Sequence, residues 1–432
     1  MDGFMEAILL AAGYGRGLEP LTHTRNKVLI PVIDKTLLDH HVESLVSAGV
    51  RKIVVVAGYM KEQLEKHVNK LAGRFSCDIK LVDQGRPSGT GDAVKRGIEE
   101  INTDYFLIVY GDVFVRSSDV KGMAALRRNV IGAYEVEDSR RYGVLITEGP
   151  LLKKIVEKPE EAYTNLINAG VYVLSDRVRK HLDNLTLSPR GEYELTEALT
   201  RLSGEEPVHV YKLSYWRDLG RPWSLLELNK DLMSAWREQV LRGRVESGVV
   251  VKNPVYIDEG AEILSGTYIV GPVYIGRDSV VGPHTYVRPY TVILSDSKIG
   301  YDVEIKESVI MSRSHISHQA YVGDSIVGEG CNLGAGTITA NLRFDEKPVR
   351  YVVKGVREST GRVKFGAAFG DFVKTGVNVS TMPGVKVGAY SWIYPGAVVT
   401  KDVPPCSIYV SEDEVRGIRD SCQVDRAVWR SY

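Results

Sequence analysis

Residues 267–300 read TYIVGPVYIGRDSVVGPHTYVRPYTVILSDSKIG, and aliphatic residues recur in this stretch at every sixth position. The same register extends in both directions over Val251, Ile257, Ile263, Ile269, Ile275, Val281, Val287, Ile293, Ile299, Ile305 and Met311. An α-helix repeats its buried face about every 3.6 residues and a strand about every 2, whereas a period of six is typical of a triangular solenoid. We therefore expect a left-handed parallel β-helix of hexapeptide repeats, in which each aliphatic side chain stacks on its counterpart one coil away.

The repeat is interrupted and then returns. After an out-of-register step it resumes at Val327, gives way to a charged segment from about 341 to 366, and returns from Phe369 to Val399. A segment of that length inside a compact domain is usually functional or disordered. The 42 glycines make up roughly a tenth of the chain, against an average of about 7%, and many fit the corners of a solenoid, where φ is often positive.

The N-terminal part of the chain has a different pattern. Amphipathic segments at 36–48 and 60–71 alternate with short apolar runs at 6–10, 52–56, 79–82 and 105–109. Continuous apolar strands that alternate with helices are typical of a parallel sheet covered on both faces, with ligands at the carboxyl ends of the strands. This pattern predicts an α/β Rossmann-like nucleotide-binding domain.

Apolar residues at near-helical spacing follow Trp223, and this spacing predicts a helix between the two patterns. We accordingly expect an α/β domain over 1–223, a connecting helix over 224–248, a β-helix domain over 249–400 and a C-terminal tail over 401–432.

The composition excludes several classes of protein. Lys+Arg and Asp+Glu both number 55, so a formal net charge of zero argues against a protein that binds nucleic acid or membranes through charge alone. The chain has no apolar stretch near the roughly 20 residues of a membrane span, and its N-terminus lacks the basic region of a signal peptide, so we expect a cytoplasmic protein with small-molecule partners. The four cysteines form no CxxC pair, which favours free buried thiols over a zinc site or disulfides.

A glycine-rich loop follows the first apolar run, at Leu10-Ala11-Ala12-Gly13-Tyr14-Gly15-Arg16-Gly17. Such a loop lets backbone N–H groups approach phosphates, and Lys27 adds a positive charge close by in the sequence. By itself, a glycine-rich loop can equally well do no more than turn the chain.

The motifs beyond this loop resemble, in their order, those of the sugar-1-phosphate nucleotidylyltransferase family. They are Gln84, Gly89-Thr90-Gly91-Asp92-Ala93, Tyr110-Gly111-Asp112, Tyr142-Gly143, Glu157-Lys158-Pro159, Asn168-Ala169-Gly170 and Trp216-Arg217-Asp218-Leu219-Gly220. The resemblance implies a nucleotide site at Ala12, Gly13, Arg16, Gln84, Gly89 and Thr90. It further implies a catalytic Lys27 on the phosphates, a Mg²⁺ site at Asp112 and Asp218, and a sugar-phosphate site at Gly143, Glu157, Lys158 and Asn168.

Two positions depart from the family pattern. Gly17 stands where the family has the loop arginine, and Asn26 stands where it has a proline. Our hypothesis is that Arg16 supplies the charge of the missing arginine, because the flanking glycines let the loop reorient.

A second set of residues lies within and after the repeat: Arg288, Lys306, His318, Tyr321, Asn332, Asn341 and Lys347. Their order and spacing resemble the acetyltransferase half of the bifunctional glucosamine-1-phosphate acetyltransferase/N-acetylglucosamine-1-phosphate uridylyltransferase family. The compact length and the Gly220-Arg221-Pro222-Trp223 joint look closer to the archaeal members.

This second resemblance implies a catalytic His318 that deprotonates a sugar amine near neutral pH. It places Arg288, Lys306, Tyr321, Asn332 and Lys347 around the sugar phosphate, with a catalytic Asn341 that steadies either the oxyanion or the histidine. It also implies acetyl-CoA as co-substrate and a homotrimer with active sites shared between subunits.

The expected function is therefore a pair of reactions. Acetylation of glucosamine 1-phosphate, or of its galactosamine epimer, by acetyl-CoA would be followed by transfer of a nucleotidyl group from an NTP, for which we expect UTP. Two alternatives are a monofunctional nucleotidylyltransferase with a structural β-helix and a non-catalytic subunit that binds nucleotide sugar.

Overall fold

The computed structural model describes residues 4–161, 163–418, 422 and 424. These residues form two compact units. The first consists of Met1–Tyr14, Asn26–Ile30 and Thr36–Asp218, and the second of Gly15–Arg25, Pro31–Lys35 and Leu219–Tyr432. The glycine-rich loop is therefore divided, because its second half packs with the second unit.

The first unit is built on a nine-stranded sheet in the order β5-β4-β1-β6-β11-β8-β12-β10-β9. Its strands are β1 Met5–Leu10, β4 Val50–Ala57, β5 Asp78–Asp83, β6 Tyr105–Tyr110, β8 Val130–Glu135, β9 Gly143–Glu148, β10 Leu151–Glu157, β11 Leu166–Ser175 and β12 His209–Lys212. Strands β5, β4, β1 and β6 are parallel, as expected, whereas β11 runs antiparallel to β6. The α/β prediction is thus confirmed, although the sheet is mixed.

Helices surround this sheet because both of its faces are apolar. Leu9 and Leu107 belong to one buried cluster, while Ile8 and Ile108, one residue before and one after, belong to another. The helices are α1 Leu37–Ser47, α2 Lys61–Ala72, α3 Thr90–Ile98, α4 Ser117–Ala125, α5 Arg179–Leu182 and α6 Leu195–Ser203. A separate two-stranded sheet pairs β7 Val113–Val115 with β13 Trp216–Asp218.

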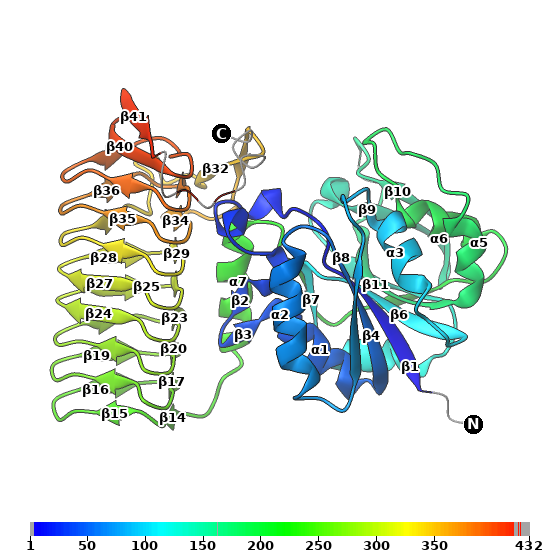
Figure 1. The fold of residues 1–432 in the computed structure, drawn as a ribbon, viewed down its shortest axis with the longest axis horizontal. Helices are drawn as coiled ribbons and strands as arrows, with labels where there is room; N and C mark the ends of the chain where they lie inside the picture. The colour runs from blue at the N-terminus through cyan, green and yellow to red at the C-terminus, as the bar shows by residue number, and fades with distance from the viewer. Residues whose placement is uncertain (1–3, 162, 419–421, 423, 425–432) are drawn as a thin grey trace. The chain divides into compact units, whose positions relative to one another are not determined.

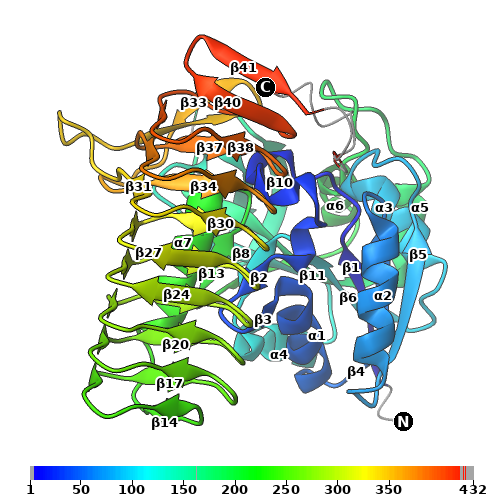
Figure 2. The same ribbon diagram turned by 60° about the vertical axis from the view of Figure 1, so that its left-hand side comes forward.

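The second unit contains a β-helix with three faces, whose strands run parallel except for the last strand, β41, and its stacked coils can be followed in Figures 1 and 2. Face A consists of β14 Val240–Leu241, β17 Val255–Ile257, β20 Val273–Ile275, β23 Thr291–Ile293, β26 Val309–Ile310, β29 Ile326–Val327, β34 Ala367–Phe369 and β37 Val385–Val387. Face B consists of β15 Arg244–Val245, β18 Glu262–Ile263, β21 Val280–Val281, β24 Lys298–Tyr301, β27 His315–His318, β30 Asn332–Leu333, β35 Lys374–Thr375, β38 Trp392–Ile393, β40 Ser407–Ser411 and β41 Glu414–Gly417. Face C consists of β16 Val250–Lys252, β19 Tyr268–Val270, β22 Tyr286–Val287, β25 Glu304–Lys306, β28 Tyr321–Gly323, β31 Ile338–Thr339, β36 Ser380–Thr381 and β39 Val398–Val399.

The predicted stacking of aliphatic residues is confirmed in most coils, with Ile257 paired to Ile275 and Ile275 to Ile293. Ile310, rather than the predicted Met311, pairs with Ile293. The reason is that the turn from β25 on face C to β26 on face A is one residue shorter than the turns of the earlier coils. The turn from β28 to β29 in the next coil is shortened in the same way, and there Val327 pairs with Ile310. We call the line of turns between these faces the C–A edge.

The connecting helix and both ends of the β-helix have other bounds than expected. The connecting helix α7 spans Pro222–Met233, shorter than predicted, because β14 already begins at Val240 and Trp236 packs against Tyr256 of the β-helix. At the far end, β40 extends face B beyond residue 400 and pairs with the antiparallel β41. The interrupting segment carries a small hairpin of β32 Arg350–Val353 and β33 Val356–Ser359.

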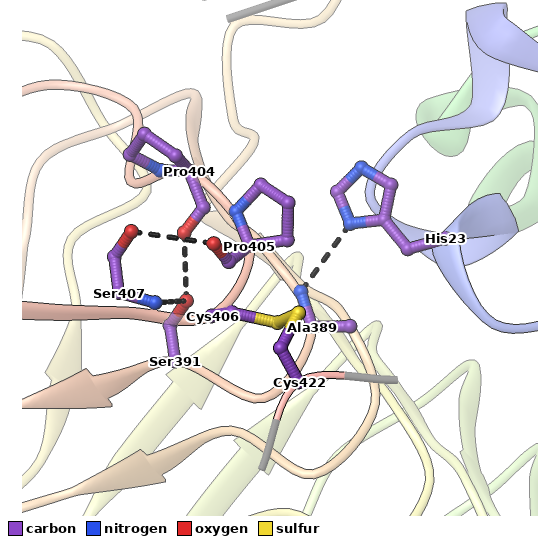
Figure 3. Close-up of a disulfide and its surroundings, with 8 residues drawn as sticks. All are labelled: His23, Ala389, Ser391, Pro404, Pro405, Cys406, Ser407 and Cys422. Carbon is purple, nitrogen blue, oxygen red and sulfur yellow. Dashed lines mark hydrogen bonds between the residues drawn. A yellow bond between two sulfur atoms is a disulfide. The ribbon is translucent and has the colours of Figure 1, made fainter. Parts of the chain in front are cut away.

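The prediction of four free thiols is wrong for two of them. Cys406 and Cys422 form a disulfide (Figure 3), and their Cα atoms lie 5.4 Å apart. No spacing signal marks this pair in the sequence, because Cys406 lies in a corner of the β-helix, with a φ of 53°, and Cys422 lies 16 residues further along the chain. Cys77 and Cys331 are free and buried, as expected.

Among the described helices, none combines the length and the apolar character that a membrane crossing requires.

Candidate functional sites

A lysine and a carboxylate meet close to the carboxyl ends of β1 and β6. Lys27 Nζ lies 2.6 Å from Asp112 Oδ2, and a Cβ placed on Gly13 would lie 3.4 Å from the same Nζ. Burial alone would raise the pKa of Asp112, but the Lys27 ammonium outweighs it and holds that pKa below its usual value. Gly13, Lys27 and Asp112 therefore form one charged site at the carboxyl ends of β1 and β6.

Asp218 approaches this site through strand pairing. In the antiparallel pair β7–β13, Asp218 lies opposite Val113, the residue that follows Asp112. Two carboxylates fit Mg²⁺, which binds one or two protein carboxylates and takes its other oxygens from phosphates and water. The described residues contain no cluster of three metal-binding side chains, so the remaining ligands would have to come from the substrate and solvent.

Gln84 and Gly89, two of the proposed nucleotide-binding residues, are in direct contact. Gln84 is buried and donates through Nε2 to the carbonyl oxygen of Gly89, 3.1 Å away, and to Asp92 Oδ2 at 2.9 Å. Gly89 has a φ of 118°, and a Cβ there would lie 2.4 Å from the Tyr193 carbonyl oxygen, so no side chain fits. The neighbouring Thr90 accepts from Leu195 N through its hydroxyl oxygen and thereby supports α6.

The four proposed sugar-phosphate residues gather at β9, β10 and β11. Gly143 pairs with Glu157, and a Cβ on Gly143 would lie 2.8 Å from Glu157 Oε2 and 3.5 Å from Asn168 Cβ. Lys158 follows directly, with a positive φ of 44°. Burial raises the pKa of Glu157, and the positive charge of the nearby Arg190 offsets this increase only in part.

The two departures from the family pattern have structural causes. A Cβ on Gly17 would lie 2.4 Å from the Gly220 carbonyl oxygen and 2.6 Å from Arg221 Nη1, so the position cannot hold an arginine. Arg221 is itself fixed by a two-point ion pair with Glu358, at 2.9 Å for both contacts. Arg16, the expected substitute, lies in the same short 3-10 helix, Arg16–Leu18, within the second unit.

Asn26 replaces the family proline with three hydrogen bonds. It is buried and donates through Nδ2 to the carbonyl oxygens of Ala11 at 3.0 Å and Tyr59 at 2.7 Å. Its Oδ1 accepts from Val28 N at 3.1 Å, which caps the turn that carries Lys27.

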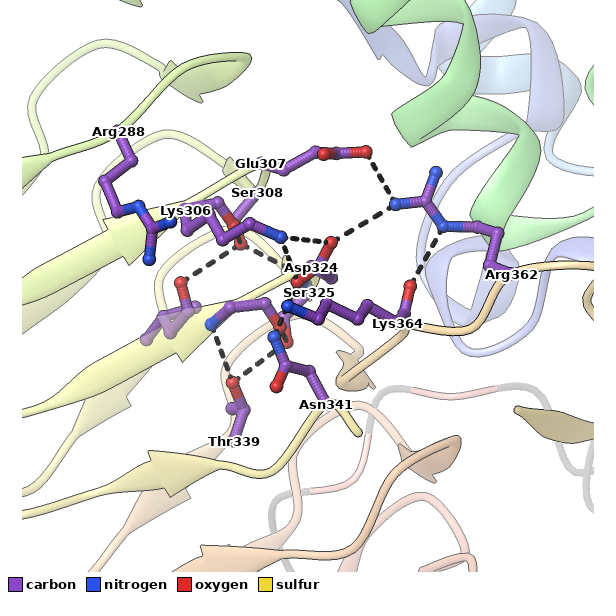
Figure 4. Close-up of polar contacts among 12 residues, drawn as sticks. Arg288, Lys306, Glu307, Ser308, Asp324, Ser325, Thr339, Asn341, Arg362 and Lys364 are labelled. Carbon is purple, nitrogen blue, oxygen red and sulfur yellow. Dashed lines mark hydrogen bonds and ion pairs between the residues drawn. The ribbon is translucent and has the colours of Figure 1, made fainter. Parts of the chain in front are cut away.

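In the second unit, four of the seven residues proposed for acetyl transfer lie on face C or its C–A edge. Three of them, Arg288, Lys306 and Asn341, are labelled in Figure 4. Asn341 donates through Nδ2 to the Tyr321 hydroxyl at 3.1 Å and to Asp324 Oδ2 at 2.6 Å. Lys306 Nζ pairs with the same Asp324 at 2.8 and 2.9 Å. Arg288, one coil before Lys306, pairs with Glu304 at 2.9 Å, and burial raises the pKa of Tyr321.

The remaining three residues lie elsewhere in the β-helix unit. His318 is the exposed last residue of β27 on face B. Asn332 is also on face B, where it pairs with His315, and Lys347 is exposed in the interrupting segment. Within one chain, then, the predicted residues form a cluster of cations and amides on face C and a separate histidine surface on face B.

Comparison with known proteins covers both units. Residues 6–235 match the family described as nucleotidyl transferase, and residues 269–403 match the GMPPB C-terminal domain. A bifunctional sugar-1-phosphate nucleotidylyltransferase/acetyltransferase of Sulfurisphaera tokodaii is 45% identical over 92% of this chain and 98% of its own length. The chain belongs to this bifunctional nucleotidylyltransferase/acetyltransferase family.

A second curated relative agrees with the assignment to this family. The bifunctional protein GlmU of Methanocaldococcus jannaschii is 40% identical over 95% of this chain and 98% of its own length. A crystal structure of UDP-glucose pyrophosphorylase complexed with UDP-glucose is 26% identical, covers 52% of this chain and 97% of that chain, and has a TM-score of 0.48. The predictions of family and of transferase class are confirmed.

Two polar residues that contact the proposed acetyl-transfer residues were not predicted from the sequence. Asp324 contacts both Lys306 and Asn341, and Arg362 of the interrupting segment reaches Asp324 at 3.3 Å. Asp324 follows Lys306 by one coil, so the repeat itself could have indicated their contact. No periodic signal could have placed Arg362, because the segment that carries it has no repeat.

Proposed function

We propose that the protein acetylates glucosamine 1-phosphate, or its galactosamine epimer, with acetyl-CoA and then transfers a nucleotidyl group from an NTP, with UTP the expected donor. The product would be a nucleotide sugar of the UDP-N-acetylglucosamine type. The names of the relatives support two activities in one chain, and the pairing of Lys27 with Asp112 at the strand ends carries the nucleotidyl half.

In nucleotidyl transfer, an oxygen of the sugar 1-phosphate attacks the α-phosphorus of the NTP, the bond to the β-phosphate breaks and pyrophosphate leaves. The chain must bring several anions together, so its main tasks are positioning and neutralisation of charge. Gly13 lets the phosphates approach the backbone and Lys27 neutralises them, while Gln84 and Gly89 hold the base. Mg²⁺ held by Asp112 and Asp218 would supply further neutralisation of the phosphate oxygens.

In acetyl transfer, the sugar amine attacks the thioester carbonyl, the carbon–sulfur bond breaks and the CoA thiol leaves. His318 would accept the proton of the amine, and Arg288, Lys306 and Lys347 would bind the 1-phosphate. His318 and Asn332 lie on face B, whereas Lys306 and Asn341 lie on face C and its edge. This separation supports our proposal of a homotrimer whose acetyl-transfer sites combine different faces of neighbouring subunits. We also propose a cytoplasmic location.

Two assays on one preparation test the proposal. We expect CoA release with glucosamine 1-phosphate and acetyl-CoA, and pyrophosphate release with N-acetylglucosamine 1-phosphate, UTP and Mg²⁺. His318→Ala should abolish only the first and Asp112→Ala only the second, while His315→Ala, on the same strand as His318, should retain both. Loss of both activities from either single substitution would contradict two independent sites.

Panels of NTPs and sugar phosphates in the second assay identify the preferred substrates. Pyrophosphate release without any CoA release would favour the monofunctional alternative, and the absence of both activities would favour the nucleotide-sugar-binding subunit.

A further inference from the structure

Asp324 is the most heavily shared carboxylate of the C–A edge. It is 1% exposed and lies in one of the two shortened turns. Lys306 donates to both of its oxygens, Asn341 donates to Oδ2 at 2.6 Å, and Arg362 reaches Oδ1 at 3.3 Å (Figure 4). Lys306 comes from the coil before Asp324, and Asn341 and Arg362 come from the connection between β31 and β34 one coil after it, so three groups meet at one buried side chain.

Arg362 connects this carboxylate to a second one. The Arg362 side chain is 13% exposed, and its guanidinium pairs with Glu307 Oε1 at 2.6 Å as well as with Asp324. Glu307 also pairs with Lys230 of α7 at 3.3 Å. Burial would raise the pKa of Glu307, but the ion pair with Arg362 outweighs it and lowers that pKa. The interrupting segment thus contributes a cation to a compact network of charges.

The hydrogen bonds of Asn341 determine which way its amide faces. A carboxylate can only accept, so the side-chain nitrogen of Asn341 must face Asp324. Its two N–H donors are taken by Asp324 and by the Tyr321 hydroxyl oxygen. The carbonyl oxygen is therefore the group that Asn341 presents to a substrate, and a carbonyl oxygen accepts hydrogen bonds but does not stabilise an oxyanion.

We propose that Asp324 and Arg362 are positioning residues of the acetyl-transfer site: Asp324 holds the Lys306 ammonium in place and orients Asn341 as a hydrogen-bond acceptor, and Arg362 fixes Asp324. The Asn341 carbonyl oxygen then accepts a hydrogen bond from the sugar amine or from the catalytic imidazole. An ammonium has three donors, so Lys306 can hold Asp324 and still donate to the sugar phosphate. A site fixed in this way loses less conformational freedom when the substrate binds.

The proposal rests on the proposed acetyl-transfer activity, and Asp324→Asn tests it. The new amide can donate to the Asn341 carbonyl oxygen and turn Asn341 around, and it no longer neutralises Lys306. We expect kcat/KM for glucosamine 1-phosphate in CoA release to fall at least about tenfold, in a range typical of a lost charged contact. The KM for acetyl-CoA and the rate of pyrophosphate release in the same preparation should not change.

Asp296→Asn is the matched control. Asp296, like Asp324, is an aspartate with a positive φ in a corner of the β-helix, with a φ of 59°, but its side chain is exposed. It should keep both activities. The single variant Asn341→Asp places two carboxylates opposite each other and should lose activity. The double variant Asp324→Asn/Asn341→Asp again pairs one carboxylate with one amide, in exchanged positions, so it should recover part of that activity.

The outcomes separate the two levels of the argument. If the unaltered protein releases no CoA, the proposed acetyl transfer fails, and this inference fails with it. If it releases CoA and Asp324→Asn behaves like Asp296→Asn, the positioning role alone is overturned. If Asp324→Asn does not fold, Arg362→Gln examines the same network, and an unchanged kcat/KM for glucosamine 1-phosphate in that variant would also overturn the proposal.

Discussion

The two units gather their candidate site residues in different ways. In the α/β unit, Gly13 and Lys27 lie together with Asp112, which comes from a distant part of the chain, and the pairing of β13 with β7 places Asp218 opposite Val113, next to Asp112. In the β-helix, Arg288, Lys306, Asp324 and Asn341 follow one another along the chain at intervals close to one coil. Each of these residues occupies a similar place on its own coil, so stacking alone lines them up.

This difference affects how each site tolerates change. A strand-end site depends on the packing of the whole sheet, whereas a coil-edge site depends mainly on neighbouring coils, since each repeat of a solenoid contacts only its neighbours. Substitutions in the two units should therefore have separable effects on activity and on stability.

The largest expected effect is a complete separation of the two activities by matched lysine substitutions. Lys27→Met removes the ammonium that faces Asp112, and we expect pyrophosphate release to fall by about 100- to 1,000-fold while CoA release is unchanged. Lys306→Met should do the reverse. Both rates measured on the same preparations check this, and an equal fall of both rates in either variant would mean that the sites are not independent.

A buried ion pair in the second unit should give the largest change in stability. Arg25 is 12% exposed and pairs with Asp371 at 2.6 Å and Glu329 at 2.9 Å. Arg25→Met leaves buried carboxylate charge without its partner, and we expect the free energy of unfolding to fall by about 3–5 kcal/mol. Arg313 pairs with the same Glu329 but is exposed, so Arg313→Met should cost less than about 1 kcal/mol. Urea unfolding of both variants measures the difference, and equal losses would argue against burial as the cause.

The disulfide should stabilise the β-helix unit without affecting the α/β unit. Cys406 and Cys422 are separated by 16 residues, and a crosslink of that size contributes about 3 kcal/mol. Cys422→Ser should lower the melting temperature of the oxidised protein, and a reducing agent should lower that of the unaltered protein to the same value. A further decrease when Cys422→Ser is reduced would point to another bond.

The smallest expected effect is a difference in acid sensitivity between two buried histidines. Burial lowers the pKa of His23 in the second unit to about 3, with a further contribution from Lys386, and lowers that of His41 in the first unit to about 4. Below pH 6.5 the unfolded chain binds protons at both histidines, whereas in the folded protein both rings stay neutral. The contribution of each histidine to the free energy of unfolding is therefore fully present above pH 6.5 and decreases as the pH falls below it. The loss is at most about 1.4 kcal/mol per pH unit for each histidine, and it ends near pH 3 for His23 and near pH 4 for His41.

Urea unfolding between pH 7 and pH 3 checks this effect, because the contributions of the two histidines should differ only below about pH 4, where His23 alone still loses stability. His23→Gln and His41→Gln should each flatten the acid side of the stability profile. Profiles parallel to that of the unaltered protein would show that the two rings do not control it.

The features that repeat or follow a motif could be predicted from the sequence. The period of six located the stacked core of the β-helix, and the strand–loop pattern located Asp112 at a strand end. The length of the connecting helix was overestimated because Val240 and Leu241, which continue its apolar spacing, belong to the first coil.

Features that depend on contacts between distant segments could not be predicted. Gly17 is explained by Gly220 and Arg221, about two hundred residues later in the chain, and Arg362 reaches Asp324 from a segment without a repeat. The orientation of Asn341 likewise depends on a carboxylate to which the resemblance gave no role.

The segment Gly15–Arg25 has a consequence for the evolution of the chain. It precedes nearly all of the α/β unit in the sequence, yet His23 accepts from Ala389 N, Arg25 pairs with Asp371, and the Tyr351 hydroxyl donates to the Glu19 carbonyl oxygen. A recombination event at the connecting helix would join these residues to a foreign β-helix without matching partners. The two halves should therefore be inherited together, and compensating changes should appear in the first 25 residues whenever the last coils diverge.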